Sequence, residues 1–466
     1  MGPQPEAALL LWAPRAWLPE GWRSDVLLQV DAQGRWAGVT PGVTTPPPVA
    51  LRLPGALLPG LVDAHSHAFQ RAFAGLAERR SAAHDTFWSW RDRMYQVALR
   101  ITPEQLRDIA AMLFLELLQG GYTHVCEFHY LHQDPQGHAY ANRLETSLAL
   151  AQAAQETGIG LTILPALYQR AGFTQATLRA DQRRFASSSA SVWEIAQAVR
   201  ARRQPLLHAG LAIHSLRAAT PAAIAELARE AGQFDGPIHV HVSEQVAEVD
   251  ECVAATGLRP VAWLAAQGLL DRRWQLVHAT QATPEEIDAI ADSGAGVVLC
   301  PATEANLGDG LPDLPRMLVR DIPLTIGSDS QINRDWREEL RWLDYGQRLL
   351  LRQRNPSADP QRRQHSTAER LWSRVLAGSA RSAGLAQWGL RAGARADALV
   401  LDEQASHLLG IAPAATLDAL VFSSPGTAWR DMLVGGHWVL RDGQHANAAT
   451  IARRFEKTMR AVWRDA

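Results

Sequence analysis

The sequence predicts a TIM (β/α)8 barrel accompanied by a small β-sandwich domain that is built from the two ends of the chain. From about Leu57 onwards, apolar strand-like segments alternate with helical segments, a pattern typical of parallel β/α units. Eight such strand segments can be counted, which is the number in this barrel. Strand patterns without intervening helices occur near both ends of the chain.

Each barrel strand is expected around a short apolar segment. In chain order the eight segments are Gly60–Asp63, His124–Glu127, Leu161–Leu164, Gly210–Ile213, Ile238–His241, Gln275–His278, Val297–Cys300 and Leu324–Gly327. Between them lie predicted helices such as Pro103–Leu118 and Pro284–Asp292, each with proline at its start, where the missing backbone N–H is tolerated. A further helix is expected near Thr367–Leu376.

The two ends of the chain are expected to pair with each other. Asp25–Val30 and Arg35–Val39, joined by a short turn, predict a hairpin near the N-terminus. Asp397–Leu401 and Met432–Val439 predict strands near the C-terminus. We therefore expect residues 1–56 and 386–466 to form one composite β-sandwich domain and residues 57–385 to form the barrel.

Composition and charge favour a small-molecule ligand. The 466 residues are 47% hydrophobic and 20% charged, with a formal net charge of -2. Because there is no basic surplus, we expect no nucleic-acid or membrane partner. The three cysteines, Cys126, Cys252 and Cys300, are widely spaced and odd in number, which favours a reducing, cytoplasmic compartment. Neither a signal peptide nor a membrane span is expected.

Residue types that bind metals occur at the ends of four predicted strands. His65 and His67 follow the first strand two residues apart, so their side chains point to the same side. His241 ends the fifth strand, His278 ends the sixth, and Asp329 follows the eighth. The carboxyl ends of barrel strands form one face, where active sites are built. We therefore expect His65, His67, His241 and Asp329 to hold one divalent metal ion.

Three imidazoles and one carboxylate suit Zn2+ best, although iron, cobalt and nickel accept the same donors. His239 lies in the same strand as His241 and is the alternative ligand. We prefer His241 because Glu244 follows it at a spacing that lets the chain turn and bring the acid over the metal. A single histidine pair could be structural. Four strand ends together argue for an active site.

The same residues predict hydrolytic chemistry. A metal lowers the pKa of its bound water, which gives hydroxide near neutral pH. Glu244 is expected to take a proton from this water and return it to a leaving nitrogen. His278 would polarise the reacting group or stabilise the developing charge. Asp329 is expected both to bind the metal and to relay a proton.

Two segments resemble sequences of the amidohydrolase superfamily. Pro59–His67 resembles its first-strand signature, and Gly393–Asp402 resembles the returning strand of its composite β-domain. The resemblance covers nearly the whole chain. Many members bind two metals through a carbamylated lysine on the fourth strand. Here Lys457 is the only lysine among 46 basic residues. The resemblance therefore implies one metal ion, as in the mononuclear deaminase branch, whose histidine-to-glutamate spacing matches His241 and Glu244.

Within that branch the chain resembles the formimidoylglutamate deiminase family in the segments His65–Arg71, Phe87–Arg91, Glu127–Tyr130, Ile213–Arg217 and Cys300–Asp309. The resemblance implies hydrolysis of N-formimidoyl-L-glutamate to N-formyl-L-glutamate and ammonia in histidine degradation, and a homodimer. The positions that resemble the family's substrate-binding residues follow strands or lie in their loops: Gln70, Arg91, Tyr130, His214 and Arg217. Arginine suits the bidentate capture of the two substrate carboxylates. Glu304 and Asn306, expected in a loop after the seventh strand, either shape the pocket or cap it.

Two alternatives stay open. A deaminase of the same branch acting on a cyclic amidine such as guanine, cytosine or a pterin would share every metal ligand. It should depend on aromatic stacking and amide contacts rather than on Arg91 and Arg217. A non-catalytic barrel should have lost a metal ligand or Glu244, and the sequence retains them all. Two of the proposed substrate-binding positions also have a purely structural interpretation. Arg91 could be a solvated helix residue, and Tyr130 could be a packed aromatic residue.

Overall fold

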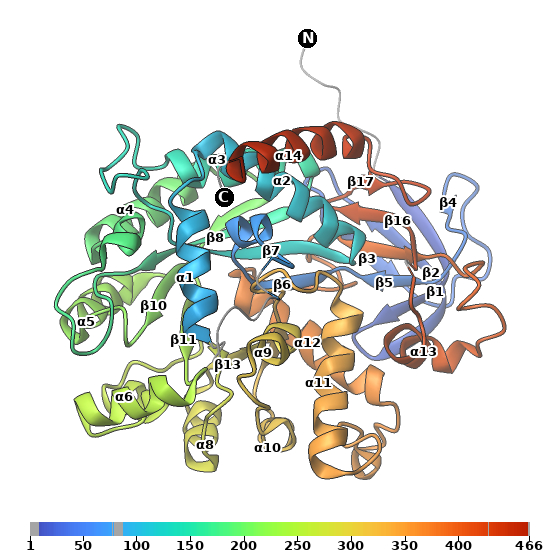
Figure 1. Cartoon of the computed structure of the whole chain (residues 1–466). Helices are drawn as coiled ribbons and strands as arrows, with labels where there is room; N and C mark the ends of the chain where they lie inside the picture. Colours follow the sequence, from blue (N-terminus) through green and yellow to red (C-terminus); the bar gives the residue numbers. More distant parts are fainter. Residues whose placement is uncertain (1–8, 77, 79–86, 427, 465–466) are drawn as a thin grey trace.

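The computed structural model describes residues 9–76, 78, 87–426 and 428–464, and the side chains of residues 87–89 are not described. Phe87 and Trp88, which carry part of the resemblance noted above, therefore have side chains outside the described part. Figure 1 shows a ring of strands surrounded by helices, and beside it a second sheet made of the blue and red ends of the chain. The predicted combination of a barrel and a separate terminal sheet is confirmed.

The barrel strands run parallel and neighbour one another in chain order. A parallel bridge between Ser66 and Asp329 links the last strand to the first and brings the ring close to closure. All eight strands expected from the sequence are present: β6 (Leu61–Ser66), β7 (Tyr122–His129), β8 (Gly160–Leu167), β10 (Leu211–Ser215), β11 (Ile238–Val242), β12 (Trp274–His278), β13 (Gly296–Leu299) and β14 (Leu324–Ile326). A short additional strand, β9 (Leu207–Ala209), pairs with β8.

Helices cover the outside of the ring, so the strands are buried on both faces, as in other parallel sheets. Every residue of β7 and of β8 is buried. The helices of this layer are α2 (Pro103–Gln119), α3 (Glu145–Thr157), α4 (Ser189–Arg200), α5 (Pro221–Glu230), α6 (Val246–Thr256), α7 (Pro260–Ala266), α8 (Pro284–Ser293), α10 (Leu314–Val319), α11 (Trp336–Leu351) and α12 (Thr367–Ala383). Two more helices, α1 (Phe87–Ala98) and α9 (Pro301–Leu307), lie beyond the carboxyl ends of the strands β6 and β13 that they follow.

Capping residues explain where two of the predicted helices begin. Thr102 accepts a hydrogen bond from the backbone N–H of Gln105 at the start of α2, and Gln105 accepts one in return. Thr283 and Glu286 form the same capping box at the start of α8. In both helices a proline occupies the first position, where its missing N–H costs nothing.

The second sheet joins strands from both ends of the chain in the order β17-β16-β15-β5-β1-β2-β3, with β4 paired to β1. Most pairs are antiparallel, but β4 and β5 run parallel to β1. The strands are β1 (Leu10–Leu18), β2 (Gly21–Val30), β3 (Trp36–Thr40), β4 (Leu51–Arg52), β5 (Leu57–Pro59), β15 (Ala398–Leu401), β16 (Trp429–Val434) and β17 (His437–Leu440). Buried side chains such as Trp36 and Leu57 form a core of their own in this sheet.

Two features of this sheet differ from the sequence prediction. The segment Met432–Val439, expected to contain strand, forms a hairpin of two strands, because Gly435 and Gly436 both have positive φ and reverse the chain between β16 and β17. Strand β1 was not predicted, since it contains Pro14. The structure accommodates this proline between the pairing of β4 with Leu11 and Trp12 and that of β5 with Ala16.

The predicted domain limits stay predictions, but the pairing shows where the chain passes between the sheets. Strand β5 still pairs with β1 and β15, whereas β6 pairs with β7. The chain therefore crosses at Gly60. The C-terminal segment also contributes α13 (Thr416–Phe422) and α14 (Ala448–Val462), and α14 lies beside α2 of the barrel (Figure 1).

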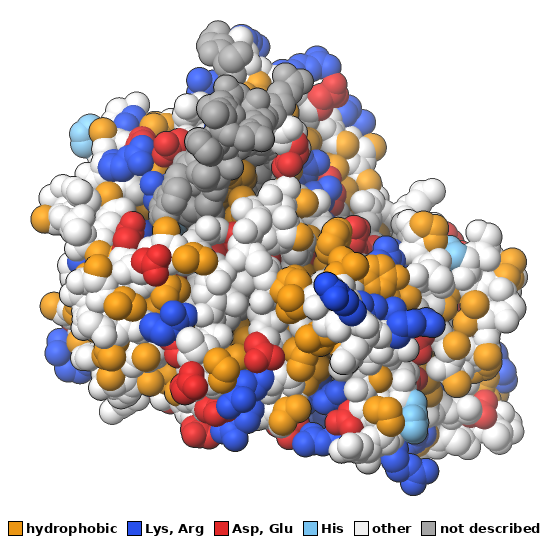
Figure 2. Space-filling view, turned by 60° about the horizontal axis from the view of Figure 1, so that its bottom comes forward, with side chains coloured by type: hydrophobic (Ala, Val, Ile, Leu, Met, Phe, Trp, Pro, Cys, Tyr) orange, Lys and Arg blue, Asp and Glu red, His pale blue; other side chains and the backbone are white. Residues whose placement is uncertain are grey.

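Acidic and basic side chains are interspersed over the face seen in Figure 2, in keeping with a net charge close to zero. Cys126, Cys252 and Cys300 are buried and form no disulfide. Within the described ranges, none of the helices combines the length and the apolar character needed to cross a membrane.

Candidate active site

The candidate site lies at the carboxyl ends of the barrel strands. His65 lies near the end of β6, His67 follows it, His241 lies near the end of β11, and His278 ends β12. His278 and Asp329 have φ values of 72° and 48°, in the left-handed region that side chains other than glycine seldom adopt. Backbone strain of this kind is often found at functional sites.

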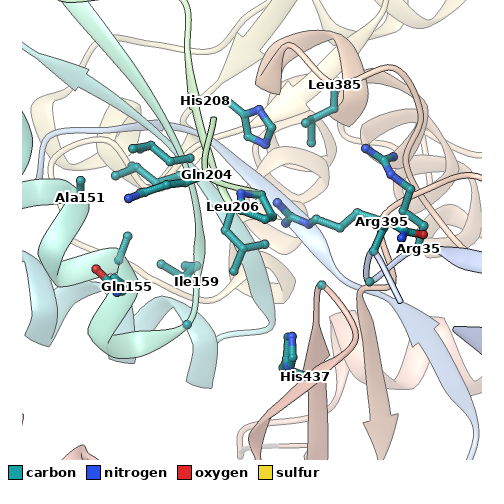
Figure 3. Close-up of a pocket in the computed structure, with 18 of the residues that line it drawn as sticks. Arg35, Ala151, Gln155, Ile159, Gln204, Leu206, His208, Leu385, Arg395 and His437 are labelled. Carbon is teal, nitrogen blue, oxygen red and sulfur yellow. The ribbon is translucent and has the colours of Figure 1, made fainter. Parts of the chain in front are cut away.

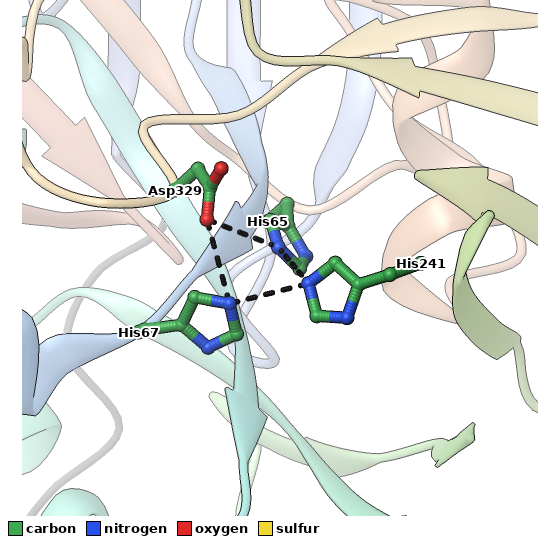
Figure 4. Close-up of side chains that lie close together, drawn as sticks. All are labelled: His65, His67, His241 and Asp329. Atoms are coloured by element: carbon green, nitrogen blue, oxygen red, sulfur yellow. Dashed lines mark hydrogen bonds and ion pairs between the residues drawn. The ribbon is translucent and has the colours of Figure 1, made fainter. Parts of the chain in front are cut away.

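Four side chains converge on one point, as Figure 4 shows. Nε2 of His241 lies 3.0 Å from Nε2 of His65 and 3.3 Å from Nε2 of His67. Oδ1 of Asp329 lies 3.4 Å from Nε2 of His65 and of His67. The structure thus brings together the four residues that the sequence singled out as ligands.

These spacings fit a bound cation. Four donors placed tetrahedrally at the usual zinc distance of ~2.05 Å lie about 3.3 Å from one another. Without a cation, three ring nitrogens and a carboxylate would face each other in a buried space. A second group, made of His278, Cys300 and Asp329, offers only three donors and shares Asp329 with the first. The described residues therefore fit one ion best at the four-donor position.

Neighbouring strands orient two of the imidazoles. Nδ1 of His67 donates to the carbonyl oxygen of Phe128, at 2.9 Å. Nδ1 of His241 donates to the carbonyl oxygen of His214, at 2.7 Å. In each ring the Nε2 lone pair is left to face the common centre. Burial lowers the pKa of His65, His67 and His241, which keeps the rings in the neutral form that binds metals.

Asp63 connects the first and last barrel strands beneath the four donors. Its carboxylate accepts hydrogen bonds from the backbone N–H and from Oγ of Ser328, at 2.9 and 2.6 Å. It also accepts one from the backbone N–H of His65, at 3.4 Å. A close approach of β14 to β6 is possible because residue 327 is glycine: a Cβ there would lie 2.6 Å from the Cβ of His65.

Glu244 and His278 face each other beside the four donors. Nε2 of His278 lies 3.6 Å from Oε1 of Glu244 and 3.8 Å from Oδ2 of Asp329. On its other side, Nδ1 of His278 bonds to Oε1 of Glu304 at 3.2 Å. Burial alone would lower the pKa of His278, but these three carboxylates raise it to about 10. Burial, together with the charges of Asp329 and Glu248, raises the pKa of Glu244 to about 7.

Glu248, four residues after Glu244, holds the turn from β11 into α6. One of its carboxylate oxygens accepts the backbone N–H of Ser243 at 3.2 Å and the other accepts that of Glu244 at 3.1 Å. Ser243 has a φ of 52°, so the chain turns sharply here. Glu248 is only 2% exposed, and its charge acts on Arg217, whose pKa it helps to raise against the effect of burial.

One cavity joins three of the four donors to all five positions expected to bind substrate. Its lining includes His67, His241 and Asp329, Glu244 and His278, and the predicted residues Gln70, Arg91, Tyr130, His214 and Arg217. Gln70 donates to the hydroxyl of Tyr130 at 3.1 Å. The ring of His214 packs on that of Tyr168 with centroids 4.3 Å apart. Arg91 lies in α1 rather than in a loop, with its guanidinium 5.5 Å from the ring of Tyr95.

Three residues whose role the sequence left open also have defined surroundings. His239 bonds to the carbonyl oxygen of Ser382 in α12 and is not among the four donors. Glu304 and Asn306 lie in α9, so the loop expected there is wrong. Glu304 supports His278, whereas Asn306 donates to Glu78 at 2.9 Å.

Sequence reasoning missed several residues of the site. Asp63 and Glu127 lie in segments that the sequence predicts as strands, without a predicted role in the site. Glu127 accepts hydrogen bonds from Oγ of Ser66 and the backbone N–H of Ala68, on either side of His67. The cavity is also lined by Trp90, Met94, Tyr95 and Leu307. The one available signal was an acidic residue, Asp63 or Glu127, inside a strand that is buried throughout. No such signal identifies Glu248, because its role depends on how the turn after β11 folds.

Comparison with known proteins agrees with this geometry. Residues 56–439 match the model of the amidohydrolase family. A formimidoylglutamate deiminase of Pseudomonas aeruginosa is 44% identical over 450 residues, which cover 96% of this chain and 98% of that protein. A 5-methylthioadenosine/S-adenosylhomocysteine deaminase of Natronomonas pharaonis is 28% identical over 86% of this chain and 85% of that protein.

A solved structure of an amidohydrolase from Brucella melitensis superposes with a TM-score of 0.91 at 36% identity, covering 98% of this chain and 100% of that one. The family match spans the barrel and the strands β5, β15 and β16 of the terminal sheet, and it includes all four donors. The chain therefore belongs to the amidohydrolase family and is a metal-dependent hydrolase that acts on carbon–nitrogen bonds.

Proposed function

We propose that this hydrolase converts N-formimidoyl-L-glutamate and water to N-formyl-L-glutamate and ammonia. The observation that carries the proposal is that one cavity is lined by three of the four donors, His67, His241 and Asp329, together with two arginines, Arg91 and Arg217. A substrate with two carboxylates and one amidine group matches this combination of charges. The Pseudomonas aeruginosa relative, which is named for this activity, supports the same substrate.

Arg217 is the main proposed anchor for a substrate carboxylate. It is 6% exposed and lines the cavity. The negative charges of Glu248 and Glu244 stabilise its protonated form. Arg91 lines the cavity from α1 and is the proposed partner of the second carboxylate. Gln70, Tyr130 and His214 provide further hydrogen-bonding groups in the wall of the same cavity.

His65, His67, His241 and Asp329 are the proposed ligands of a single divalent ion, for which zinc suits the donor set best. When bound, such an ion lowers the pKa of a coordinated water so that a nucleophile is available near neutral pH. A second, carbamate-bridged ion is not expected, because Lys457, the only lysine, lies in α14.

Glu244 and His278 are proposed to handle the protons and charge of the reaction. Glu244 takes a proton from the attacking water as its oxygen bonds to the formimidoyl carbon, and then donates this proton to the terminal nitrogen. The second proton of the water reaches the same nitrogen by way of Asp329, the bond between the carbon and this nitrogen breaks, and ammonia leaves as the carbonyl group forms. His278, kept protonated by Glu244, Glu304 and Asp329, stabilises the negative charge that develops next to the carbon. Asp329 shares a proton-relay role with Glu244.

A deaminase of cyclic amidines is the second candidate, and the aromatic residues Trp90, Tyr95 and Tyr130 in the cavity favour it. The arginines count against it, since a neutral ring needs no buried guanidinium. The non-catalytic alternative lacks support, because every donor and Glu244 are in place.

Further expectations stay proposals: zinc as the ion, a role in histidine degradation, a cytoplasmic location, a homodimer, and the absence of nucleic-acid or membrane partners. The domain limits 1–56 with 386–466 and 57–385 belong with them.

The test is ammonia release from N-formimidoyl-L-glutamate, compared with guanine and cytosine, together with metal analysis of the same sample. We expect release from the first substrate alone and about one metal ion per chain. Release from a cyclic amidine, with none from N-formimidoyl-L-glutamate in a fully metal-loaded sample, would refute the substrate assignment.

The variant Arg217→Ala tests the anchor. Loss of a charged hydrogen-bonding pair is expected to raise KM by roughly a hundredfold while the metal content stays unchanged. Arg229→Ala, an exposed arginine of α5, is the matched control and should have the KM of the wild type. An unchanged KM in Arg217→Ala would show that this residue does not bind substrate.

A further inference from the structure

A second cavity of about 790 Å3 lies at the other end of the barrel strands from the candidate active site. Its walls come from the start of β8, from the segment Gln204–His208, from α3, and from the turns of the terminal sheet at Gly34 and Gly435. Figure 3 shows side chains of the barrel and of the terminal sheet around one common space. The cavity is thus formed only where the two sheets meet.

The lining carries positive charge and no acidic residue. Arg35, Arg395, His208 and His437 are all in the wall. Arg395 is bound on one side by Asp397, with hydrogen bonds of 2.9 and 2.6 Å, and contacts Nδ1 of His124 at 3.0 Å. Arg35 donates to the carbonyl oxygen of Gly393 at 3.0 Å and forms no ion pair with the described carboxylates. The charge of Arg35 is therefore available to an anion.

His208 adds a polar group that lacks a partner. Its Nε2 is buried and makes no hydrogen bond within the described part of the chain. Burial, followed by the nearby charge of Arg395, lowers the pKa of this imidazole to about 4, so that it is neutral near pH 7. A buried nitrogen without a partner costs free energy. Because the single N–H of the neutral ring bonds to the backbone of Pro205, Nε2 can only accept, and a ligand O–H or N–H group that donates to it would remove this cost.

The remaining wall supplies apolar surface and neutral hydrogen-bonding groups. Ile159, Leu206 and Leu385 line one space with Ala151 on α3 (Figure 3). Amide side chains, including those of Gln155 and Gln204, stand among them. A cavity that combines apolar walls with a few polar groups has the character of a small-molecule site.

We propose that this cavity binds a small organic anion, with its carboxylate at Arg35, its apolar body against Ile159, Leu206 and Leu385, and any hydroxyl or amino group that it carries at Nε2 of His208. The site is separate from the proposed substrate pocket, since the two cavities share no lining residue. It depends on the junction of barrel and terminal sheet, so occupancy would stabilise that junction.

Isothermal titration calorimetry with octanoate on the metal-loaded protein tests the proposal. We expect one saturable site per chain with a Kd at or below about 1 mM. Octanol and octylamine, which have the same apolar body without a carboxylate, should bind at least about tenfold more weakly. Inorganic phosphate should also bind more weakly, because it has no apolar body.

Two variants test separately the charge of Arg35 and the free volume of the cavity. Arg35→Ala should raise the Kd for octanoate roughly tenfold or more, and Ala151→Trp should abolish binding by filling the cavity. The control Arg23→Ala, on an exposed arginine of the same sheet, should bind as the wild type does. Arg217→Ala should also bind normally, which distinguishes this site from the substrate pocket.

Several outcomes would overturn the proposal. They are the absence of saturable binding, equal affinity for octanol or octylamine, tighter binding of phosphate than of octanoate, and an unchanged Kd in both Arg35→Ala and Ala151→Trp. Loss of octanoate binding in Arg217→Ala would show that the anion binds in the active site instead. Circular dichroism of each variant verifies its fold, and two independent substitutions keep the test valid if one variant fails to fold.

Discussion

Replacing Glu248 by glutamine is expected to lower kcat/KM without removing the metal. Glu248 touches none of the four donors in the described structure, but both of its oxygens accept backbone N–H groups of the turn that carries Glu244. Glutamine has one acceptor oxygen and a terminal NH2 group. One of the two N–H groups, at Ser243 or Glu244, would therefore lose its partner.

The expected size follows from these contacts. A hydrogen bond to a charged acceptor contributes about 1.5–3 kcal/mol, and a buried donor left unpaired costs a similar amount. If the bond is needed to place Glu244 in the transition state, kcat/KM should fall by roughly ten- to a hundredfold. The loss of negative charge beside Arg217 should change KM as well, because Glu248 is the charged group with the largest effect on the pKa of that guanidinium.

Steady-state kinetics of ammonia release, with metal analysis of the same samples, measure both effects. A fall in kcat reports the position of Glu244, and a change in KM reports Arg217. Asp250→Asn is the matched control, because it removes an exposed acid from the same helix, α6. Wild-type kcat and KM in Glu248→Gln would refute the positioning role, and so would an equal loss in Asp250→Asn.

Three further predictions concern the metal, the closure of the barrel and pH. Treatment with a chelator should abolish activity and lower Tm, and added Zn2+ should restore both. Gly327→Ala should weaken metal binding, because its Cβ would lie 2.6 Å from that of His65, whereas Gly38→Ala, with no atom within 4 Å, should be neutral in a metal titration. Burial raises the pKa of Glu339 well above its usual range, so the folded state keeps this proton to higher pH than the unfolded state does. The contribution of Glu339 to the free energy of unfolding is full at pH values below about 4.3, the pKa of a glutamate in the unfolded chain. This contribution declines by up to ~1.4 kcal/mol per pH unit as the pH rises through the pKa of Glu339 in the folded state. Urea unfolding from pH 5 to 9 should show a smaller decline in Glu339→Gln, and an identical decline would contradict this.

The barrel and its four donors could be predicted because both depend on short-range patterns. Each strand is an apolar segment, and the period of two places His65 and His67 on one side of the chain. His241 and Asp329 lie at or just after strand ends, so the barrel itself brings them together. No contact between distant residues had to be known in advance.

The rest of the site depends on contacts that short-range patterns do not contain. Arg91 reaches the cavity from α1, although its sequence position suggested a loop. Glu248 is an acid on a helix, and only the sharp turn at Ser243 directs its carboxylate back to the backbone. Strand β1 forms although it contains Pro14, because its partners pair on either side of that proline.

The contacts divide the site into two parts that should respond differently to mutation. The metal group is held by the barrel strands: Phe128 orients His67, the backbone of His214 orients His241, and Asp63 ties β6 to Ser328. The two arginines of the substrate end depend on helices that follow the strands, because α1 carries Arg91 and α6 carries Glu248, whose charge acts on Arg217. Changes in strand contacts should therefore alter metal affinity, and changes in helix contacts should alter KM and kcat at constant metal content. Because members of a family keep the metal chemistry while their substrates differ, this division lets the helices change the substrate without disturbing the ion.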